Sequence, residues 1–136
     1  MIIVLDTNVL ISGILKPFSQ AAAILRLVAT GSLQAAFDIR LLSEYGDVLS
    51  RPKFSFSGDQ VRSFLDQLEL EGFNVSASPL PFRLRDPDDE PFLEVALAAR
   101  AMAIVTGNKR HFPYKEFEGV KILSPAEFID LFSGKI

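Results

Sequence analysis

Cysteine is absent from this chain of 136 residues, and histidine occurs only once. Without cysteine there is no disulfide, no thiolate zinc site, no iron–sulfur cluster and no cysteine nucleophile. A single histidine also excludes paired-histidine and histidine-rich metal sites. Any bound metal must therefore take mostly oxygen ligands, which points to Mg²⁺ or Mn²⁺.

The chain also has few long apolar runs and no excess of positive charge. No apolar run approaches the ~20 residues of a membrane span. The first residues lack the basic segment of a signal peptide, so we expect a cytoplasmic protein without a membrane partner. With 14 Lys and Arg against 17 Asp and Glu, the net charge is -3, which excludes a polybasic nucleic-acid binder. An enzyme that engages phosphates through a metal and a few local cations stays possible.

The remaining composition is that of a folded domain. Hydrophobic residues make up 49% of the chain and charged residues 23%, which excludes intrinsic disorder. The length fits one domain that spans residues 1–136. Short apolar runs alternate with longer amphipathic ones, and this alternation predicts an α/β fold with a parallel sheet.

The expected elements follow from local patterns. Ile2–Leu5 is a continuous apolar run, typical of a strand buried on both faces. Ser57 with Gln60, and Ser124 with Glu127, form capping boxes that begin two helices. In full, we expect strands at residues 2–5, 33–37, 73–76, 103–106 and 120–123, and helices at 20–29, 41–50, 57–72, 91–102 and from 124 onward.

Acidic residues fall where these strands end or where helices begin. Asp6 directly follows the first strand, and Glu44 lies in the first turn of the helix after the second strand. Four acids occur in the five positions Asp86–Glu90, just before another helix. Open α/β sheets bind ligands at the carboxyl ends of their strands, so we expect these acids to converge on a divalent ion.

A purely structural role is open for each of these groups. Asp6 suits a helix N-cap, and Glu44 suits the positive end of a helix dipole. Thr106 and Asn108 lie at the end of the expected strand 103–106, where Gly107 and Asn108 could simply form a turn. If this strand is a neighbour of strand 2–5, Thr106 and Asn108 would instead lie beside Asp6. The run Asp86–Glu90 is harder to explain in this way, because crowded carboxylates repel one another unless a cation offsets them.

Five segments together resemble the PIN-domain ribonucleases, in a PIN_3-like branch related to the VapC toxins of toxin–antitoxin systems. The matching segments are residues 4–12 (VLDTNVLIS), 43–54, 86–99, 104–113 and 122–128 (ILSPAEF). They follow one another in the expected order along nearly the whole chain. The ordered set is specific, although each segment alone is common.

The resemblance implies a three-layer α/β/α sandwich with a central parallel β-sheet. It also implies an acidic pocket that binds Mg²⁺ or Mn²⁺ and cleaves RNA. Asp6, Glu44 and Asp89 match the first three acids of the family, and Asp86 is a possible accessory acid. Asn108 stands where many relatives have a fourth acid, which removes a charge from the expected metal site.

The resemblance also suggests a role for each residue of the expected site. Asp6 and Asp89 would ligate the ion, and Glu44 would ligate it or deprotonate the attacking water. Asn108 would support the metal or its waters. Further supporting or substrate-binding groups are Thr7 and Asn8, which would hold the Asp6 loop by hydrogen bonds to the backbone, Thr106, and the cations Lys109, Arg110, Arg83 and Arg85. The single histidine, His111, is expected in a turn or in packing rather than as a base.

For partners, the resemblance implies an RNA substrate, a small antitoxin that blocks the acidic pocket, and a homodimer. Two other functions stay open. Asn108 favours a catalytically weak PIN-fold module that binds RNA or protein. A receiver-like phosphoryl-transfer domain fits the sequence less well. The best position for its phosphate-accepting acid is directly after the third expected strand, and no acid occurs there.

Overall fold

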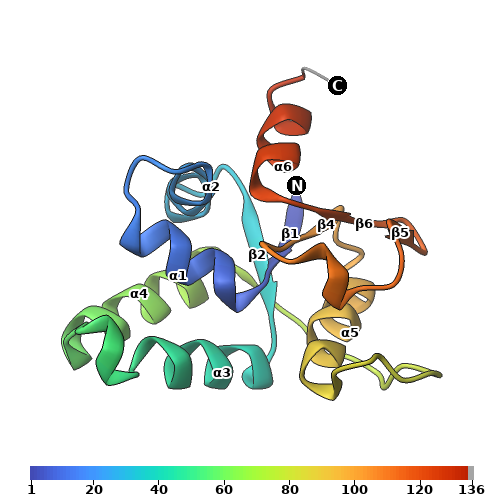
Figure 1. Cartoon of the computed structure of the whole chain (residues 1–136), viewed down its shortest axis with the longest axis horizontal. Coiled ribbons are helices and arrows are strands. Elements are labelled where there is room, and N and C mark those ends of the chain that lie inside the picture. The colour runs from blue at the N-terminus through green and yellow to red at the C-terminus, as the bar shows by residue number, and fades with distance from the viewer. Residues whose placement is uncertain (135–136) are drawn as a thin grey trace.

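The computed structural model describes residues 1–134 and is built around a six-stranded sheet (Figure 1). Its strands stand in the order β3-β2-β1-β4-β6-β5. They are β1 (Ile2–Leu5), β2 (Gln34–Phe37), β3 (Phe73–Asn74), β4 (Ala103–Val105), β5 (Glu116–Phe117) and β6 (Val120–Leu123). All neighbours pair in parallel except β5, which runs antiparallel to β6. The expected central parallel sheet is confirmed, and the short hairpin strand β5 adds an edge that the sequence pattern did not predict.

Helices cover both faces of this sheet, as the α/β/α prediction requires. They are α1 (Thr7–Leu15), α2 (Gln20–Ala29), α3 (Ile39–Leu49), α4 (Gly58–Glu71), α5 (Glu90–Ala99) and α6 (Pro125–Phe132). Helix α2 packs against α1, α4 and α6, whereas α5 lies on the other side against β1, β2 and β4 (Figure 1). Within the sheet, β2 lies next to β1 on one side, and the chain later returns to place β4 next to β1 on the other side. Right-handed crossovers in opposite directions place the helices on opposite faces.

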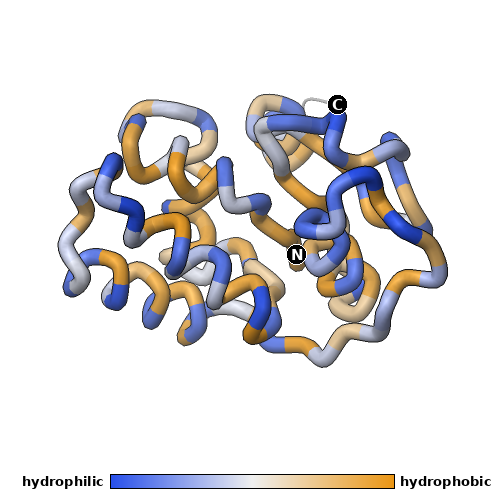
Figure 2. The backbone as a smooth tube through the Cα atoms, turned by 60° about the horizontal axis from the view of Figure 1, so that its bottom comes forward, coloured by the Kyte–Doolittle hydropathy of each residue, from blue (hydrophilic) through white to orange (hydrophobic). Residues whose placement is uncertain are grey.

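The core lies between these layers. Ile3, Val4 and Leu5 in β1, and Ile104 and Val105 in β4, are wholly buried. Every residue of β1 and of β4 is apolar, and Figure 2 shows helical turns at the outside of the molecule along which hydrophobic and hydrophilic residues alternate. Such continuous apolar strands are typical of a parallel sheet that is covered on both faces. The residues that directly follow β1 and β4 are therefore positioned by strands that are packed into the core.

Two helix boundaries differ from the prediction by two residues or more, and the other helix ends differ by at most one. Helix α3 begins at Ile39 rather than at residue 41, because the Asp38 side chain caps it and accepts hydrogen bonds from two backbone N–H groups. Glu44 is consequently in the second turn of α3, and its predicted place in the first turn is wrong. Helix α5 ends at Ala99 rather than at residue 102, because Arg100 adopts the left-handed conformation with φ 52°.

Helix α1 has no counterpart in the prediction. It contains Gly13 and several β-branched residues, all weak helix formers, so propensity alone does not indicate it. Packing on α2 supports it instead: a Cβ at Gly13 would lie 2.5 Å from Leu25 Cδ1, which shows how closely the two helices approach. Within residues 1–134 no single helix has the length and composition to span a membrane, although α1 and α2 together do so across a bend of 101°.

Candidate functional site

The candidate site lies where the carboxyl ends of β1 and β4 meet. The two strands are paired so that Leu5 stands opposite Val105. Asp6 follows Leu5, and its backbone N–H donates to the carbonyl oxygen of Val105 over 2.9 Å. Thr106 follows Val105, and its hydroxyl donates to Asp6 Oδ2 over 2.7 Å. The two strands are therefore neighbours, which is the condition under which Thr106 is expected to lie beside Asp6. They flank the point where the sheet's crossovers change direction, which is where open α/β sheets bind ligands.

Asp6 combines the structural role and the site role that the sequence leaves open. It is 6% exposed and caps α1, with Oδ1 accepting a hydrogen bond from the backbone N–H of Thr7 at 2.8 Å. Oδ2 accepts from Thr106 and, at 3.4 Å, from the Asn8 side chain. Burial raises the pKa of Asp6 although these hydrogen bonds oppose the shift. The result is a fixed carboxylate at the positive end of a helix.

Glu44 reaches the same place from α3. The Thr7 hydroxyl donates to its carboxylate, which joins the second acid to the loop of the first. Thr7 therefore contacts a side chain, and its predicted bond to the backbone is wrong. Burial raises the pKa of Glu44, and the negative charge of Asp6 adds to the shift. Asp6 and Glu44 thus belong to one electrostatic cluster.

Tyr45 lies beside Glu44 on α3 and was missed as a site residue. Its side chain is wholly buried, and its hydroxyl donates to the carbonyl oxygen of Leu5 over 2.5 Å. This contact fixes the end of β1 directly before Asp6. The sequence does carry a signal, because Leu41, Tyr45 and Leu49 are spaced as one buried helix face, and a buried tyrosine hydroxyl needs an acceptor.

Asp89 is the third acid, and one of its oxygens has no partner. It ends the short 3-10 turn η2 (Pro87–Asp89), precedes α5 and is 6% exposed. Within residues 1–134, Asp89 Oδ2 is the one buried side-chain oxygen or nitrogen that makes no hydrogen bond. Burial raises the pKa of Asp89 to about 6, and the charges of Asp6 and Glu44 add to the shift while His111 opposes it. A buried, unpartnered carboxylate oxygen is costly unless a ligand satisfies it.

His111 lies closer to the site than expected. It falls in the 3-10 turn η3 (Lys109–His111), as the turn prediction requires. However, its Nδ1 is 3.6 Å from Asp89 Oδ1, and its Nε2 is 3.0 Å from Asn108 Nδ2. The ring therefore connects the third acid to the position where relatives carry a fourth. Nothing in the local sequence distinguishes such a histidine from an ordinary turn residue.

Asn108 is held by its own turn. Its backbone N–H donates to the Thr106 hydroxyl over 3.1 Å, and its side-chain oxygen accepts from the backbone N–H of Arg110 over 3.2 Å. Asn8 joins the same loop, since its Oδ1 accepts from the Gly107 N–H over 2.9 Å. The expected bond from Asn8 to the backbone is thus found, on the loop after β4. The loops after β1 and β4 are thereby tied together.

Two acids of the cluster before α5 have structural roles. Asp86 is exposed and caps η2 through the backbone N–H of Asp88 at 2.9 Å. Glu90 is buried, accepts from the Leu84 N–H over 2.9 Å and pairs with Arg83 at 3.2 Å. Arg83 therefore has a structural partner in Glu90, and its expected contact with phosphate stays a prediction. The crowding of acids that the sequence shows is relieved in part, because the side chains of Asp86 and Glu90 have separate partners.

Glu94 extends this pattern and was also missed. It is buried on α5, accepts from the Leu80 N–H over 2.9 Å and pairs with Arg40 at 2.6 Å. Glu90 and Glu94 together hold residues 80–84 along α5. Their spacing of four on an otherwise apolar helix is the signal that could have found this role.

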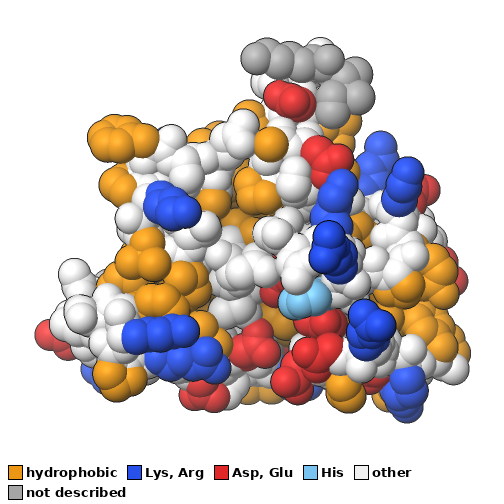
Figure 3. All heavy atoms as spheres, in the orientation of Figure 1, with side chains coloured by type: hydrophobic (Ala, Val, Ile, Leu, Met, Phe, Trp, Pro, Cys, Tyr) orange, Lys and Arg blue, Asp and Glu red, His pale blue; other side chains and the backbone are white. Residues whose placement is uncertain are grey.

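An open hollow of about 550 Å³ lies over Asp89. It is lined by Arg85, Asp86, Pro87, Asp89, Asn108, Arg110 and His111. Figure 3 shows Asp and Glu side chains gathered beside the pale-blue histidine, with Lys and Arg side chains around them. Lys109 is held away from this hollow, because it pairs with Glu127 of α6 at 2.8 Å and lowers the pKa of that acid.

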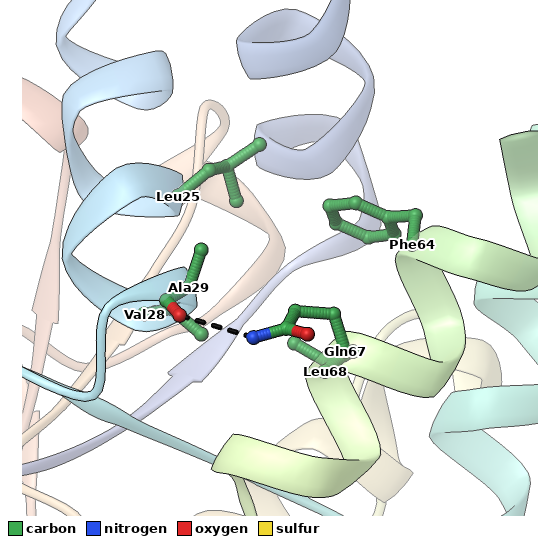
Figure 4. A pocket seen from close by; sticks show the side chains of 6 residues that line it. All are labelled: Leu25, Val28, Ala29, Phe64, Gln67 and Leu68. Carbon is green, nitrogen blue, oxygen red and sulfur yellow. Dashed lines mark hydrogen bonds between the residues drawn. The ribbon is translucent and has the colours of Figure 1, made fainter.

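A smaller hollow between α2 and α4 has no such chemistry (Figure 4). Its lining is apolar apart from Gln67, whose Nε2 donates to the Ala29 carbonyl oxygen over 3.1 Å. With no titratable group in the lining, this hollow is a packing gap. The chemistry of the molecule gathers at the ends of β1 and β4.

The donors at the site fit a hydrated divalent ion. In the part of the chain that the structure describes, no three acidic or histidine side chains converge tightly enough to enclose a metal. Asp6, Glu44 and Asp89 do act on one another electrostatically, and Asp89 Oδ2 is unpartnered. Mg²⁺ needs only one or two carboxylates, because it keeps several of its waters. The oxygen donors present meet that requirement.

The comparison with known families agrees with this geometry. The PIN domain family matches residues 2–110, a span that includes Asp6, Glu44 and Asp89. The chain belongs to the PIN-domain family. PIN domains are generally nucleases that use divalent metal ions. None of the curated protein sequences matches the chain.

A solved structure supports the PIN-like fold. One chain of the crystal structure of VapBC2 from Rickettsia felis, bound to a DNA fragment from their promoter, is similar to this PIN domain with a TM-score of 0.59. The two are 20% identical, and the match covers 91% of this chain and 98% of that chain. The correspondence therefore extends over nearly all of both chains.

Proposed function

We propose that this chain is a divalent-metal-dependent endoribonuclease and the toxin component of a type II toxin–antitoxin system. The observation that carries the proposal is Asp89, a buried carboxylate with one unpartnered oxygen, in electrostatic contact with Asp6 and Glu44. Membership of the PIN-domain family supports nuclease chemistry. The fold shared with a VapBC2 chain supports the toxin assignment.

Asp6 and Asp89 are the residues we propose as holders of a Mg²⁺ or Mn²⁺ ion, directly or through water, with Asn108 as an uncharged support. When bound, such an ion polarises a phosphodiester and lowers the pKa of a water molecule. Thr106 and Asn8 orient Asp6 through their hydrogen bonds to Oδ2.

Glu44 is our proposed general base. Its carboxylate is half-buried and is oriented by the Thr7 hydroxyl. The raised pKa of Glu44 makes its carboxylate a stronger proton acceptor than an exposed glutamate. We propose that one Glu44 carboxylate oxygen accepts the proton of the attacking water.

Cleavage of labelled RNA tests this function. The wild-type chain should cleave in Mn²⁺ or Mg²⁺ and stop when a chelator is added. Asp6→Asn and Asp89→Asn should each lower the rate at least about 100-fold, because loss of a group that only orients a metal ligand already costs about 10–100-fold. Asp66→Asn, an exposed acid on α4, is the matched control and should cleave normally. Cleavage by Asp6→Asn at the wild-type rate contradicts the proposal.

The toxin role has its own test. VapBC2 is a complex bound to promoter DNA, and we propose that this chain also pairs with a small antitoxin, which places a basic side chain over the acidic hollow, and forms a homodimer. Expressed without a partner in bacteria, the wild-type chain should arrest growth, whereas Asp89→Asn should not. Equal growth of both strains, with RNA cleavage intact in vitro, would instead favour a role in RNA processing.

Asn108 favours a second candidate, a catalytically weak PIN-fold module that binds RNA or protein. The side chain brings no charge to the site, and its oxygen already accepts from the Arg110 N–H. Under this alternative the wild-type chain binds RNA without turnover. Asn108→Asp would then gain cleavage activity, whereas an active wild-type enzyme gains at most a modest increase.

A further inference from the structure

Another hollow, of about 270 Å³, lies beside the one over Asp89 and differs from it in the charge of its lining. It is lined by Lys109, Arg110, Phe112, Pro113, Tyr114, Lys115 and Ile122. Arg110 lines both hollows, so they are adjacent. The hollow over Asp89 has both acids and arginines in its lining, whereas its neighbour has cations and aromatic rings but no acid, and we call it the basic hollow.

Two cations of the basic hollow are uncompensated. Lys109 pairs with Glu127, but Arg110 and Lys115 form no ion pair with any residue from 1 to 134. Both side chains are exposed. In a chain with a net charge of -3, a local pair of unpaired cations beside an acidic site is a favourable place for phosphates.

Tyr114 supplies an aromatic surface in the same hollow. Its side chain is 44% exposed, although two other rings brace it. The ring stacks on Phe117 of β5 at 5.2 Å between centroids and 30° between planes, and it meets Phe82 edge-on at 6.3 Å. Phe82 and Phe117 are themselves in contact at 5.3 Å. An exposed ring in a fixed orientation loses little entropy when a nucleic-acid base stacks on it.

We propose that this hollow receives the single-stranded RNA that leads into the acidic site. Arg110 and Lys115 contact neighbouring phosphates, and Tyr114 stacks on a base. This inference rests on the proposed nuclease function and extends it by naming the substrate's form and path. The strand is single because the bases of a duplex are already stacked and cannot reach a protein ring.

Fluorescence anisotropy of a labelled, unstructured RNA of about 12 nucleotides tests the stacking contact. Binding by the full chain is measured in EDTA, which stops cleavage. Tyr114→Leu keeps apolar packing but removes the ring, and should bind at least about fivefold more weakly. Tyr114→Phe should bind within about twofold of wild type. Phe73→Leu, an aromatic that is 40% exposed on β3 at the opposite edge of the sheet, is the matched control.

Salt dependence tests the phosphate contacts. For single strands, the slope of log K against log salt falls by about 0.7 for each phosphate contact removed. Arg110→Ala and Lys115→Ala should each lower the slope by about that amount. Arg62→Ala, which removes an exposed cation on α4, should leave the slope unchanged.

The outcomes separate this inference from the function on which it rests. Wild-type affinity in Tyr114→Leu, or equal affinity for duplex and single-stranded RNA, overturns the single-strand path even if the protein cleaves RNA. Binding to protein but not to RNA also overturns it. If Tyr114→Leu loses RNA binding while the wild-type chain fails to cleave RNA in Mn²⁺, the single-strand path is supported and the nuclease function is overturned.

Discussion

Asp89 makes the metal-free protein sensitive to pH. Its pKa is raised to about 6 from 3.8, so between these values the folded protein binds a proton that the unfolded chain does not. Folding stability therefore falls as pH rises through that range. We expect the melting temperature of the metal-free protein to be several degrees lower at pH 7.5 than at pH 5, and Asp89→Asn to flatten the decrease. Identical pH profiles for both proteins would contradict the assignment.

Tyr45 supports the site from beneath. Tyr45→Phe removes the donor to the Leu5 carbonyl oxygen in a fully buried place. We expect a loss of about 1–2 kcal/mol in the free energy of unfolding, measured by urea denaturation. Tyr114→Phe removes the same hydroxyl from an exposed ring and should change stability by less than about 0.5 kcal/mol. Equal effects of the two substitutions would mean that the buried hydrogen bond contributes nothing.

At this scale the sequence predicts some residues and misses others for a physical reason. Asp6 and Thr106 are predictable because each directly follows a buried strand, and the carboxyl ends of parallel strands meet at one edge. Tyr45, Glu94 and His111 act through partners more than 20 residues away in the chain. No local pattern encodes those partners, so only the folded structure reveals the contacts.

Close helix packing explains why α1 exists at all. A Cβ at Gly13 would lie 2.5 Å from Leu25 Cδ1 and 3.1 Å from the backbone of Ala21. Gly13→Ala should therefore destabilise the protein by about 1–3 kcal/mol through overpacking. In α3, the nearest atom to a Cβ at Gly46 is Leu65 Cδ1 at 3.4 Å, so Gly46→Ala should be neutral or stabilising. Thermal melts of the two variants compare these effects, and the same sign for both would contradict the packing argument.

Helix α5 holds an irregular segment through buried glutamates. Glu94→Ala removes the acceptor of the Leu80 N–H and the partner of Arg40. We expect a cost of about 2 kcal/mol and faster hydrogen exchange at the Leu80 amide. Glu69→Ala, on the exposed face of α4, is the control. Unchanged exchange at Leu80 would show that the segment is held by other contacts.

The element boundaries show where sequence patterns stop being informative. Helix α2 and strands β1 and β6 match their expected residues. Ile2–Leu5 is a continuous apolar run, and Gly119 and the capping box at Ser124 delimit β6. Strand β5 has only two residues, and it pairs with β6 through a turn in which Glu118 and Gly119 have positive φ. Such a short edge strand carries no periodic signal. Helix α1 depends on tertiary packing rather than on propensity.

The overall fold brings together acidic residues that are far apart in the sequence. The acids at positions 6, 44 and 89 come from three elements, and the return of the chain to both sides of β1 is what brings those elements together. The basic hollow next to them is made by the segment between β4 and β6. A protein with a net negative charge thus has a local group of cations beside Asp89, and overall charge alone could not predict that arrangement.

The position of bound manganese tests the central claim most directly. Crystals of the wild-type protein grown with Mn²⁺, measured at the manganese absorption edge, should give an anomalous difference peak between Asp6 and Asp89, and crystals of Asp89→Asn should lack it. An anomalous map with no peak near these two carboxylates, or an equally strong peak in Asp89→Asn, would contradict the account.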